Sequence, residues 1–205
     1  MILYLMRHGE TDWNKKHLFQ GRTDIPLNEK GREVAKWASK GLANIKIDVA
    51  FCSPLCRARE TAELVLTGRN IPLISDERII EMGFGAYEAT DMRFPDENIK
   101  VFFEHPERYR DTEKGVEPFE SVVARTEQFL KELEENPKLQ NSTVLIVTHG
   151  ATIRGLLCAF ERKPLADFWE GGVHKNCGVS ILEVKNGKRT VLQEAITLYE
   201  EKNLK

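Results

Sequence analysis

Residues 2–9 read ILYLMRHG, in which a short apolar run from Ile2 to Leu5 gives way to Arg7 and His8. A short apolar run bounded by a loop signal predicts a buried strand. Residues 143–150, TVLIVTHG, repeat the pattern with six strand-forming residues before a histidine and a glycine. We therefore predict two buried strands, each followed within a few residues by a histidine and a glycine.

Strands and helices alternate outward from these two segments. Further strands are predicted at 49–52, 71–74, 179–184 and 190–194. Helices are predicted after Asn28, which provides an N-cap, and at 57–66 with Gly68 as its C-terminal cap, 119–135, 151–160 and 165–169. This alternation indicates an α/β fold, a three-layer α/β/α sandwich around a mainly parallel sheet.

The chain has 205 residues, a length that fits one domain over residues 1–205. Residues 81–120 interrupt the pattern, because glycines and prolines break every periodicity there. We expect this stretch to be an inserted segment that covers the carboxyl ends of the strands.

Composition narrows the classes of function. With 30 Lys+Arg and 32 Asp+Glu the net charge is -2, so no electrostatic signature of a nucleic-acid or membrane-surface partner is present. No apolar run approaches the ~20 residues of a membrane span, and the first ten residues lack the basic region of a signal peptide. Four cysteines form no disulfide framework. We expect a soluble cytoplasmic protein, either a monomer or a homodimer.

Polar side chains follow the predicted strands where each strand ends. In parallel sheets the ligand crevice lies beyond the carboxyl ends of the strands. The side chains expected there are Arg7, His8, Ser53, Arg57, Arg78, Glu81 and His149.

Two arginines in one pocket indicate a tetrahedral anion. Guanidinium groups stay charged and match the geometry of phosphate, so Arg7 and Arg57 favour a phosphate ester as the small-molecule substrate. A metal site built from His8, His149 and Glu81 is the alternative, but fixed positive charges would repel a dication. We expect no metal and no cofactor.

These residue types suit phosphoryl transfer through a covalent intermediate. Neutral His8 can attack phosphorus while the arginines hold the equatorial oxygens. Glu81, when protonated, can donate a proton to the leaving oxygen and later accept one from the attacking water. His149 can hold a phosphoryl oxygen through the transition state.

Several residues also allow simpler interpretations. Arg57 could be a surface residue paired with Glu60, and Ser53 is more typical of a cap or turn than of a nucleophile. His174 could border the pocket or be a solvated loop residue. The aromatic residues of the inserted segment could form a local core or a wall of the substrate site.

Four motifs resemble the histidine phosphatase superfamily, also called the phosphoglycerate mutase-like family. They are RHGET at residues 7–11 followed by Trp13 and Asn14, SPxxRAxxTA at 53–62, ExxFG at 81–85 and VTHG at 147–150. The resemblance implies a metal-independent phosphohistidine mechanism with the roles given above. It also implies additional phosphate contacts from Asn14, Gln20 and Gly21.

The chain resembles the phosphatase branch of the superfamily, which includes broad-specificity and α-ribazole phosphatases. It departs from the family pattern at residues 87–89, YEA in place of the common Trp-Glu-Gly. A cofactor-dependent phosphoglycerate mutase remains the alternative. A mutase must exclude water and bind two acidic groups, and the covering segment carries cations that keep this alternative open. These are Arg93, Lys100, Arg108, Arg110 and Lys114. A phosphate-binding protein without catalysis would need neither His8 nor Glu81.

Overall fold

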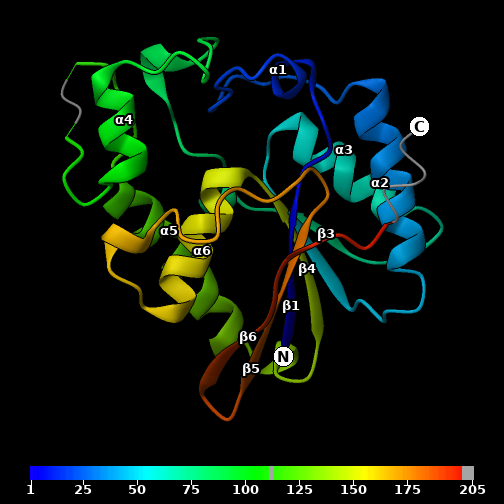
Figure 1. Cartoon of the computed structure of the whole chain (residues 1–205). Coiled ribbons are helices and arrows are strands. Elements are labelled where there is room, and N and C mark those ends of the chain that lie inside the picture. Colours follow the sequence, from blue (N-terminus) through cyan, green and yellow to red (C-terminus); the bar gives the residue numbers. More distant parts are fainter. Residues whose placement is uncertain (111–112, 200–205) are drawn as a thin grey trace.

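The computed structural model describes residues 1–110 and 113–199, which fold around one six-stranded sheet (Figure 1). The strands are β1 (Ile2–Arg7), β2 (Val49–Cys52), β3 (Leu73–Ser75), β4 (Thr143–Thr148), β5 (Val179–Lys185) and β6 (Lys188–Ile196). Their order is β3-β2-β4-β1-β5-β6. The first four run parallel, whereas β5 is antiparallel to β1 and β6 to β5. The predicted α/β fold with a mainly parallel sheet is confirmed.

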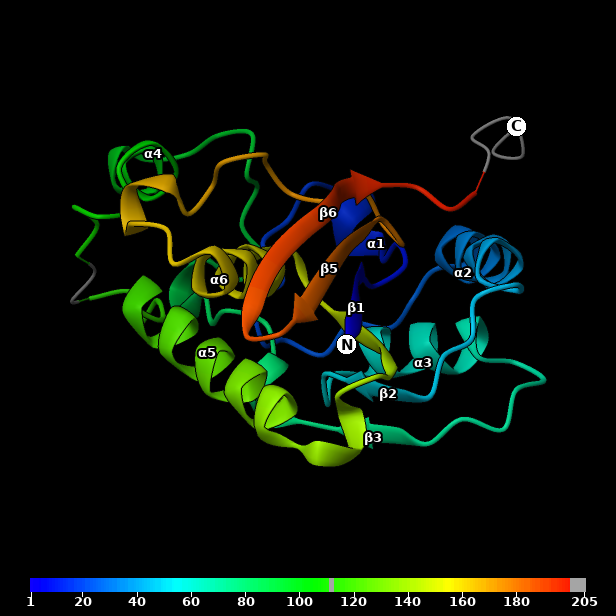
Figure 2. The ribbon, with the colours of Figure 1, turned by 90° about the horizontal axis from the view of Figure 1, so that it is seen from below.

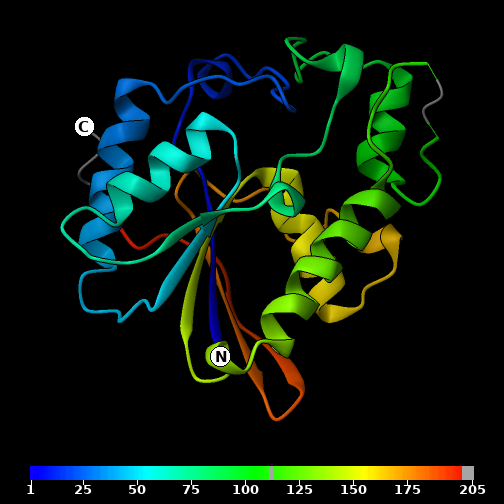
Figure 3. The same cartoon turned by 180° about the vertical axis from the view of Figure 1, so that it is seen from behind.

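Helices cover both faces of this sheet. The α-helices of the described residues are α1 (Asp12–Lys15), α2 (Glu29–Gly41), α3 (Cys56–Val65), α4 (Glu97–Glu104), α5 (Phe119–Glu135) and α6 (Gly150–Glu161). Helices α2 and α3 lie on one face, and α5 and α6 on the other (Figure 2). The view from behind shows the same two layers (Figure 3). No helix in the described part of the chain is long and apolar enough to cross a membrane.

The apolar run of β4 follows from its position between the two helical layers. Val144 and Ile146 point into the core shared with α5 and α6, whereas Leu145 and Val147 point into the core shared with α2 and α3. All four are fully buried. Because successive side chains of a strand point to opposite faces, a strand covered on both sides has apolar residues at every position.

Residues 81–118 leave the sheet and carry α4 beyond the edge where β1 and β4 end (Figure 1). Their buried aromatic residues, among them Phe84, Phe102 and Tyr109, form a third core with Phe119 at the start of α5. This core holds the segment against α5 and α6. The boundaries of the domain and of the inserted segment remain predictions.

A few predicted elements differ from the structure. Helix α1 falls in a stretch predicted as loop, because four residues are too few for a periodic pattern; its local signal is the capping box of Thr11 and Asn14. The C-cap of α3 is Leu66, so the assignment of Gly68 was wrong by two residues. Strand β3 begins at Leu73, two residues later than predicted.

Candidate active site

Loops at the carboxyl edge of the sheet enclose a cavity of about 290 Å³. Arg7 ends β1 and His8 follows it, while His149 follows β4. Arg57 lies in the first turn of α3, and Glu81 comes after β3. The fold therefore brings together residues from four distant parts of the sequence. The predicted site residues that line the cavity are Arg7, His8, Asn14, Gln20, Gly21, Arg57 and Glu81.

The imidazole of His8 is buried and has one engaged nitrogen. Its Nδ1 lies 2.7 Å from the carbonyl oxygen of Gly9. A carbonyl oxygen only accepts, so Nδ1 carries the proton and Nε2 keeps its lone pair. Burial, followed by the positive charges of Arg57 and Arg7, lowers the pKa of His8 well below 6.5. The ring is therefore neutral near pH 7, as a nucleophile requires.

Arg57 is fully buried and is held at every part of its guanidinium group. Nη1 donates to the carbonyl oxygen of Thr23 at 2.9 Å and Nη2 to that of Gly21 at 2.6 Å. Its Nε donates to His149 Nδ1 at 3.2 Å. The interpretation of Arg57 as a surface residue paired with Glu60 is wrong. The side chain of Arg57 is fully buried, and Glu60 pairs with Arg32 instead.

Arg7 presents an unused donor. Its Nη1 donates to the carbonyl oxygen of His174 at 2.6 Å. Its Nε is buried and has no hydrogen-bond partner in the described part of the chain. A buried guanidinium donor without a partner is costly, and an anion in the cavity would satisfy it.

His149 lies behind Arg57, with its ring centroid 5.1 Å from that of His8. Because Nδ1 accepts from Arg57, Nε2 carries the proton and donates to Ser53 Oγ at 2.6 Å. Burial and the adjacent Arg57 lower the pKa of His149 well below 6.5. The neutral ring thus orients Arg57. Its contact with a phosphoryl oxygen remains a prediction.

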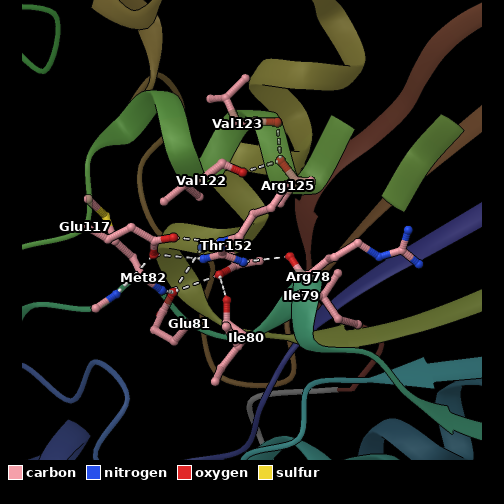
Figure 4. A network of polar contacts seen from close by, with 12 residues as sticks. Arg78, Ile79, Ile80, Glu81, Met82, Glu117, Val122, Val123, Arg125 and Thr152 are labelled. Carbon is pink, nitrogen blue, oxygen red and sulfur yellow. Dashed lines mark hydrogen bonds and ion pairs between the residues drawn. The ribbon is translucent and has the colours of Figure 1, made fainter. Parts of the chain in front are cut away.

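Glu81 is held by the first turn of α6 (Figure 4). Its Oε1 accepts hydrogen bonds from the backbone N–H of Met82 at 2.8 Å and from the N–H and hydroxyl of Thr152, each at 3.1 Å. Oε2 has only a long contact of 3.4 Å with the N–H of Ala151. One carboxyl oxygen therefore anchors the side chain, and the other is available to a substrate.

Gly150 keeps open the space between Arg7 and Glu81. A Cβ at this position would lie 3.8 Å from Arg7 Nε and 3.9 Å from Glu81 Oε2, and 2.8 Å from a methyl group of Val173. The unused Nε donor and the available carboxyl oxygen therefore border the same space. A phosphate ester there could contact both groups.

A cluster of ion pairs holds the backbone around Glu81 (Figure 4). Glu117 accepts from the N–H of Gly83 at 3.2 Å and pairs with Arg125 at 2.9 Å. Arg125 in turn donates to the carbonyl oxygen of Arg78 at 2.7 Å. The backbone is thus held on both sides of Glu81. Sequence reasoning missed Glu117 and Arg125, because nothing local links them to the acid motif.

Helix α1 and the loop after it contribute two amide side chains to the cavity lining, Asn14 and Gln20. The amide oxygen of Asn14 accepts from the N–H of Thr11 at 3.1 Å, and that of Gln20 from the hydroxyl of Thr11 at 2.9 Å. Both oxygens thus accept hydrogen bonds, so the NH₂ groups are the donors that these two side chains can offer a ligand.

The carboxylate of Glu88 supports the neighbouring turn. It accepts hydrogen bonds from the backbone N–H groups of Arg22 at 3.0 Å and Thr23 at 2.9 Å. Gly21 has φ +54, and a Cβ there would overlap Glu88. At the departure from the family motif, Ala89 adopts φ 70, a left-handed conformation that favours glycine. The turn is therefore formed with alanine in a strained position.

Two other expectations at this edge were wrong. Arg78 does not face the cavity but pairs with Asp76 at 2.6 Å and with Glu132 of α5 at 2.5 Å. His174 is neither a border of the cavity nor solvated, since it is 1% exposed and its Nε2 lies 2.6 Å from Ser180 Oγ. Its contribution is the carbonyl oxygen that holds Arg7.

Metal-ligand geometry is not found in the part of the chain that the structure describes. No group of three or more His, Cys, Asp or Glu side chains there is arranged to hold a metal ion. Independence from metal remains a prediction.

Known proteins resemble this chain over nearly its whole length. A family model described as "Histidine phosphatase superfamily (branch 1)" matches residues 3–197. Phosphoserine phosphatase 1 of Hydrogenobacter thermophilus is 30% identical over 202 residues, 96% of this chain and 93% of that protein. Adenosylcobalamin/alpha-ribazole phosphatase of Salmonella typhimurium is 34% identical over 189 residues, covering 88% and 90%. The structure of Bacillus stearothermophilus YhfR has a TM-score of 0.86 at 34% identity, covering 95% and 96%.

Proposed function

This chain belongs to the histidine phosphatase superfamily (branch 1) and is a phosphatase of that type; on this premise we propose that it hydrolyses small phosphate monoesters without a metal ion, through a phosphohistidine on His8. The observation that carries this mechanism is the buried imidazole of His8, which lines the cavity and whose Nδ1 contact with Gly9 leaves the lone pair on Nε2. Beside it, the unpartnered Nε of Arg7 and the available Oε2 of Glu81 border the space at Gly150.

In the first step the lone pair of His8 Nε2 forms a bond to phosphorus, and the bond between phosphorus and the ester oxygen breaks. The leaving oxygen takes a proton from Glu81, which becomes a carboxylate. Arg7 and Arg57 offset the charge on the equatorial oxygens, and burial strengthens this interaction because the local dielectric is low.

In the second step a water molecule attacks the phosphorus of the phosphohistidine. Glu81 accepts a proton from that water, and the bond between phosphorus and Nε2 breaks. Inorganic phosphate leaves, and both His8 and Glu81 return to their starting protonation states.

The direct test is phosphate release from a panel of small phosphate monoesters in EDTA near about pH 6–7. We expect hydrolysis by the wild type, a phosphoryl label on the protein that is acid-labile and base-stable, and loss of both in His8→Ala. His105→Ala is the matched control, because its side chain is 48% exposed and is absent from the cavity lining. Hydrolysis that survives His8→Ala would refute the nucleophile assignment.

The same assay decides between the phosphatase and the two alternatives. A mutase would isomerise 3-phosphoglycerate without releasing phosphate. A phosphate-binding protein would bind inorganic phosphate but neither release it from esters nor become labelled.

We also infer a cytoplasmic monomer or homodimer. The four cysteines are all free thiols, which is typical of a reducing compartment. Light scattering on the purified protein would measure the oligomeric state, and an assembly larger than a dimer would refute this inference.

A further inference from the structure

The cavity has two chemically different ends. The end at the sheet holds the charged residues of the site. Most of the remaining wall is apolar, formed by Leu18, Phe19, Phe84, Met92, Phe103 and Trp169. Arg7, Arg57 and Glu81 are the only Arg, Lys, Asp or Glu residues in the lining that the structure describes. All three are used by the phosphoryl chemistry.

Four of the apolar residues form a continuous aromatic wall. The ring centroids of Phe19 and Phe84 lie 5.0 Å apart, those of Phe19 and Phe103 lie 6.3 Å apart, and those of Phe103 and Trp169 lie 5.2 Å apart. The indole N–H of Trp169 donates to the carbonyl oxygen of Phe102 at 2.9 Å. Because this donor is occupied, the wall offers a substrate carbon surface and no hydrogen bond from the indole.

Part of the apolar lining of the cavity is exposed to solvent. Met92 is 36% exposed, Phe103 37% and Val173 48%, and all three line the cavity. A single exposed apolar residue is ordinary, but several around one cavity indicate a place where an apolar ligand is buried. Binding of such a ligand would remove this surface from water.

The cations of the covering segment do not complement a charged substrate. None of them lines the cavity, and four pair with carboxylates of the same region: Arg93 with Asp91, Lys100 with Glu97, Arg108 with Glu107 and Arg110 with Glu120. Apart from His8, the other polar side chains of the lining are Asn14, His17, Gln20 and Asn176. Against the aromatic rings, a carboxylate or ammonium group would therefore lose its hydration without gaining a counter-charge from the covering segment.

We propose that the preferred substrates are phosphate monoesters whose leaving group is an uncharged aryl or alkyl group, selected by the wall at Phe103. The inference rests on the proposed phosphatase function and concerns the same site. The ester oxygen would lie near Glu81, and the organic group would extend along Phe103 toward Met92.

The test is a series of straight-chain alkyl phosphates from ethyl to hexyl, assayed beside O-phosphoserine and 3-phosphoglycerate. The alcohols have similar acidity, so the chemical step stays constant while the buried surface grows. We expect kcat/KM to rise about fourfold per buried methylene and to exceed the values for both charged substrates. A kcat/KM independent of chain length, or a preference for phosphoserine, would overturn the inference and leave the phosphatase assignment intact. Absence of hydrolysis for every ester would overturn both.

Two variants locate the selectivity. Phe103→Ala should reduce the chain-length dependence, whereas Phe94→Ala should not, because Phe94 is 80% exposed on the same segment and does not line the cavity. Met92→Lys places a cation at an exposed position of the wall and should raise kcat/KM for 3-phosphoglycerate relative to hexyl phosphate. Equal slopes in the wild type and Phe103→Ala, or no change of preference in Met92→Lys, would refute the role of this wall.

Discussion

Replacing Glu81 by glutamine removes the acidic carboxyl proton that would be transferred to the leaving group. It keeps the hydrogen bonds that hold the side chain. The amide oxygen of glutamine can accept the same three bonds from Met82 and Thr152 that Oε1 accepts, at 2.8 to 3.1 Å. The NH₂ group then takes the place of Oε2, which has only the 3.4 Å contact with Ala151. We therefore expect the variant to fold as the wild type does.

The loss should depend on the leaving group. Positioned general acids contribute about 10²–10⁴ in rate, or roughly 3–5 kcal/mol of barrier, and an alkyl phosphate should lose this full amount. 4-Nitrophenolate leaves without a proton, so formation of the phosphohistidine from 4-nitrophenyl phosphate should slow by less than about tenfold. Water attack still needs Glu81 as a base, so the phosphohistidine should accumulate.

The assay is rapid-mixing absorbance of nitrophenol, with alkyl phosphate turnover measured in parallel. Glu81→Gln should release a burst of nitrophenol close to one equivalent per site, followed by slow turnover. Glu10→Gln is the matched control, because its carboxylate contacts Asn28 and Lys30 and is absent from the cavity lining. Equal losses for both substrates without a burst would refute proton transfer by Glu81.

Three further outcomes follow from particular residues. Gly150→Ala should lower kcat/KM by about a hundredfold and weaken inhibition by inorganic phosphate, because its methyl group would enter the space between Arg7 and Glu81. Unchanged kinetics would contradict the assignment of that space to the substrate. Ala89→Gly should raise the free energy of unfolding by about 0.5–1 kcal/mol, because it relieves the strain of the left-handed backbone at φ 70. The melting temperature should then be roughly 2 °C higher, and a lower one would contradict this reasoning. Burial lowers the pKa of His174 from 6.5 to about 4, so the unfolded chain binds a proton that the folded protein does not between these pH values. The free energy of unfolding should therefore fall as pH decreases through this window, by about 3 kcal/mol from this residue; urea titrations should show a weaker pH dependence in His174→Gln, and an equal dependence would refute the role of this imidazole.

Local patterns predicted most of the elements. Helix α5 and strand β4 have the predicted bounds, because each carries a long periodic or continuous apolar pattern. Helix α1 was missed because a helix of four residues has no periodicity. Strand β3 was misplaced by two residues, since a three-residue edge strand has little pattern of its own.

The rule that a ligand crevice lies beyond the carboxyl ends of parallel strands also predicted which side chains would meet. It placed Arg7, His8 and His149 together because the carboxyl ends of parallel strands share one edge. It failed for Arg78, whose guanidinium group turns toward Asp76 and Glu132. The rule locates a backbone position but not the direction of a long side chain.

The sequence alone therefore determined the α/β layers, the family motifs and the edge of the sheet where the site forms. These depend on patterns within a strand or helix and on the short motifs that follow them. Three features come from packing alone: His149 contacts Arg57 and Ser53, Arg7 Nε has no partner in the described part of the chain, and His174 is buried. The physical reason is that these contacts join residues far apart in sequence, and packing selects among the many partners that each side chain could have had.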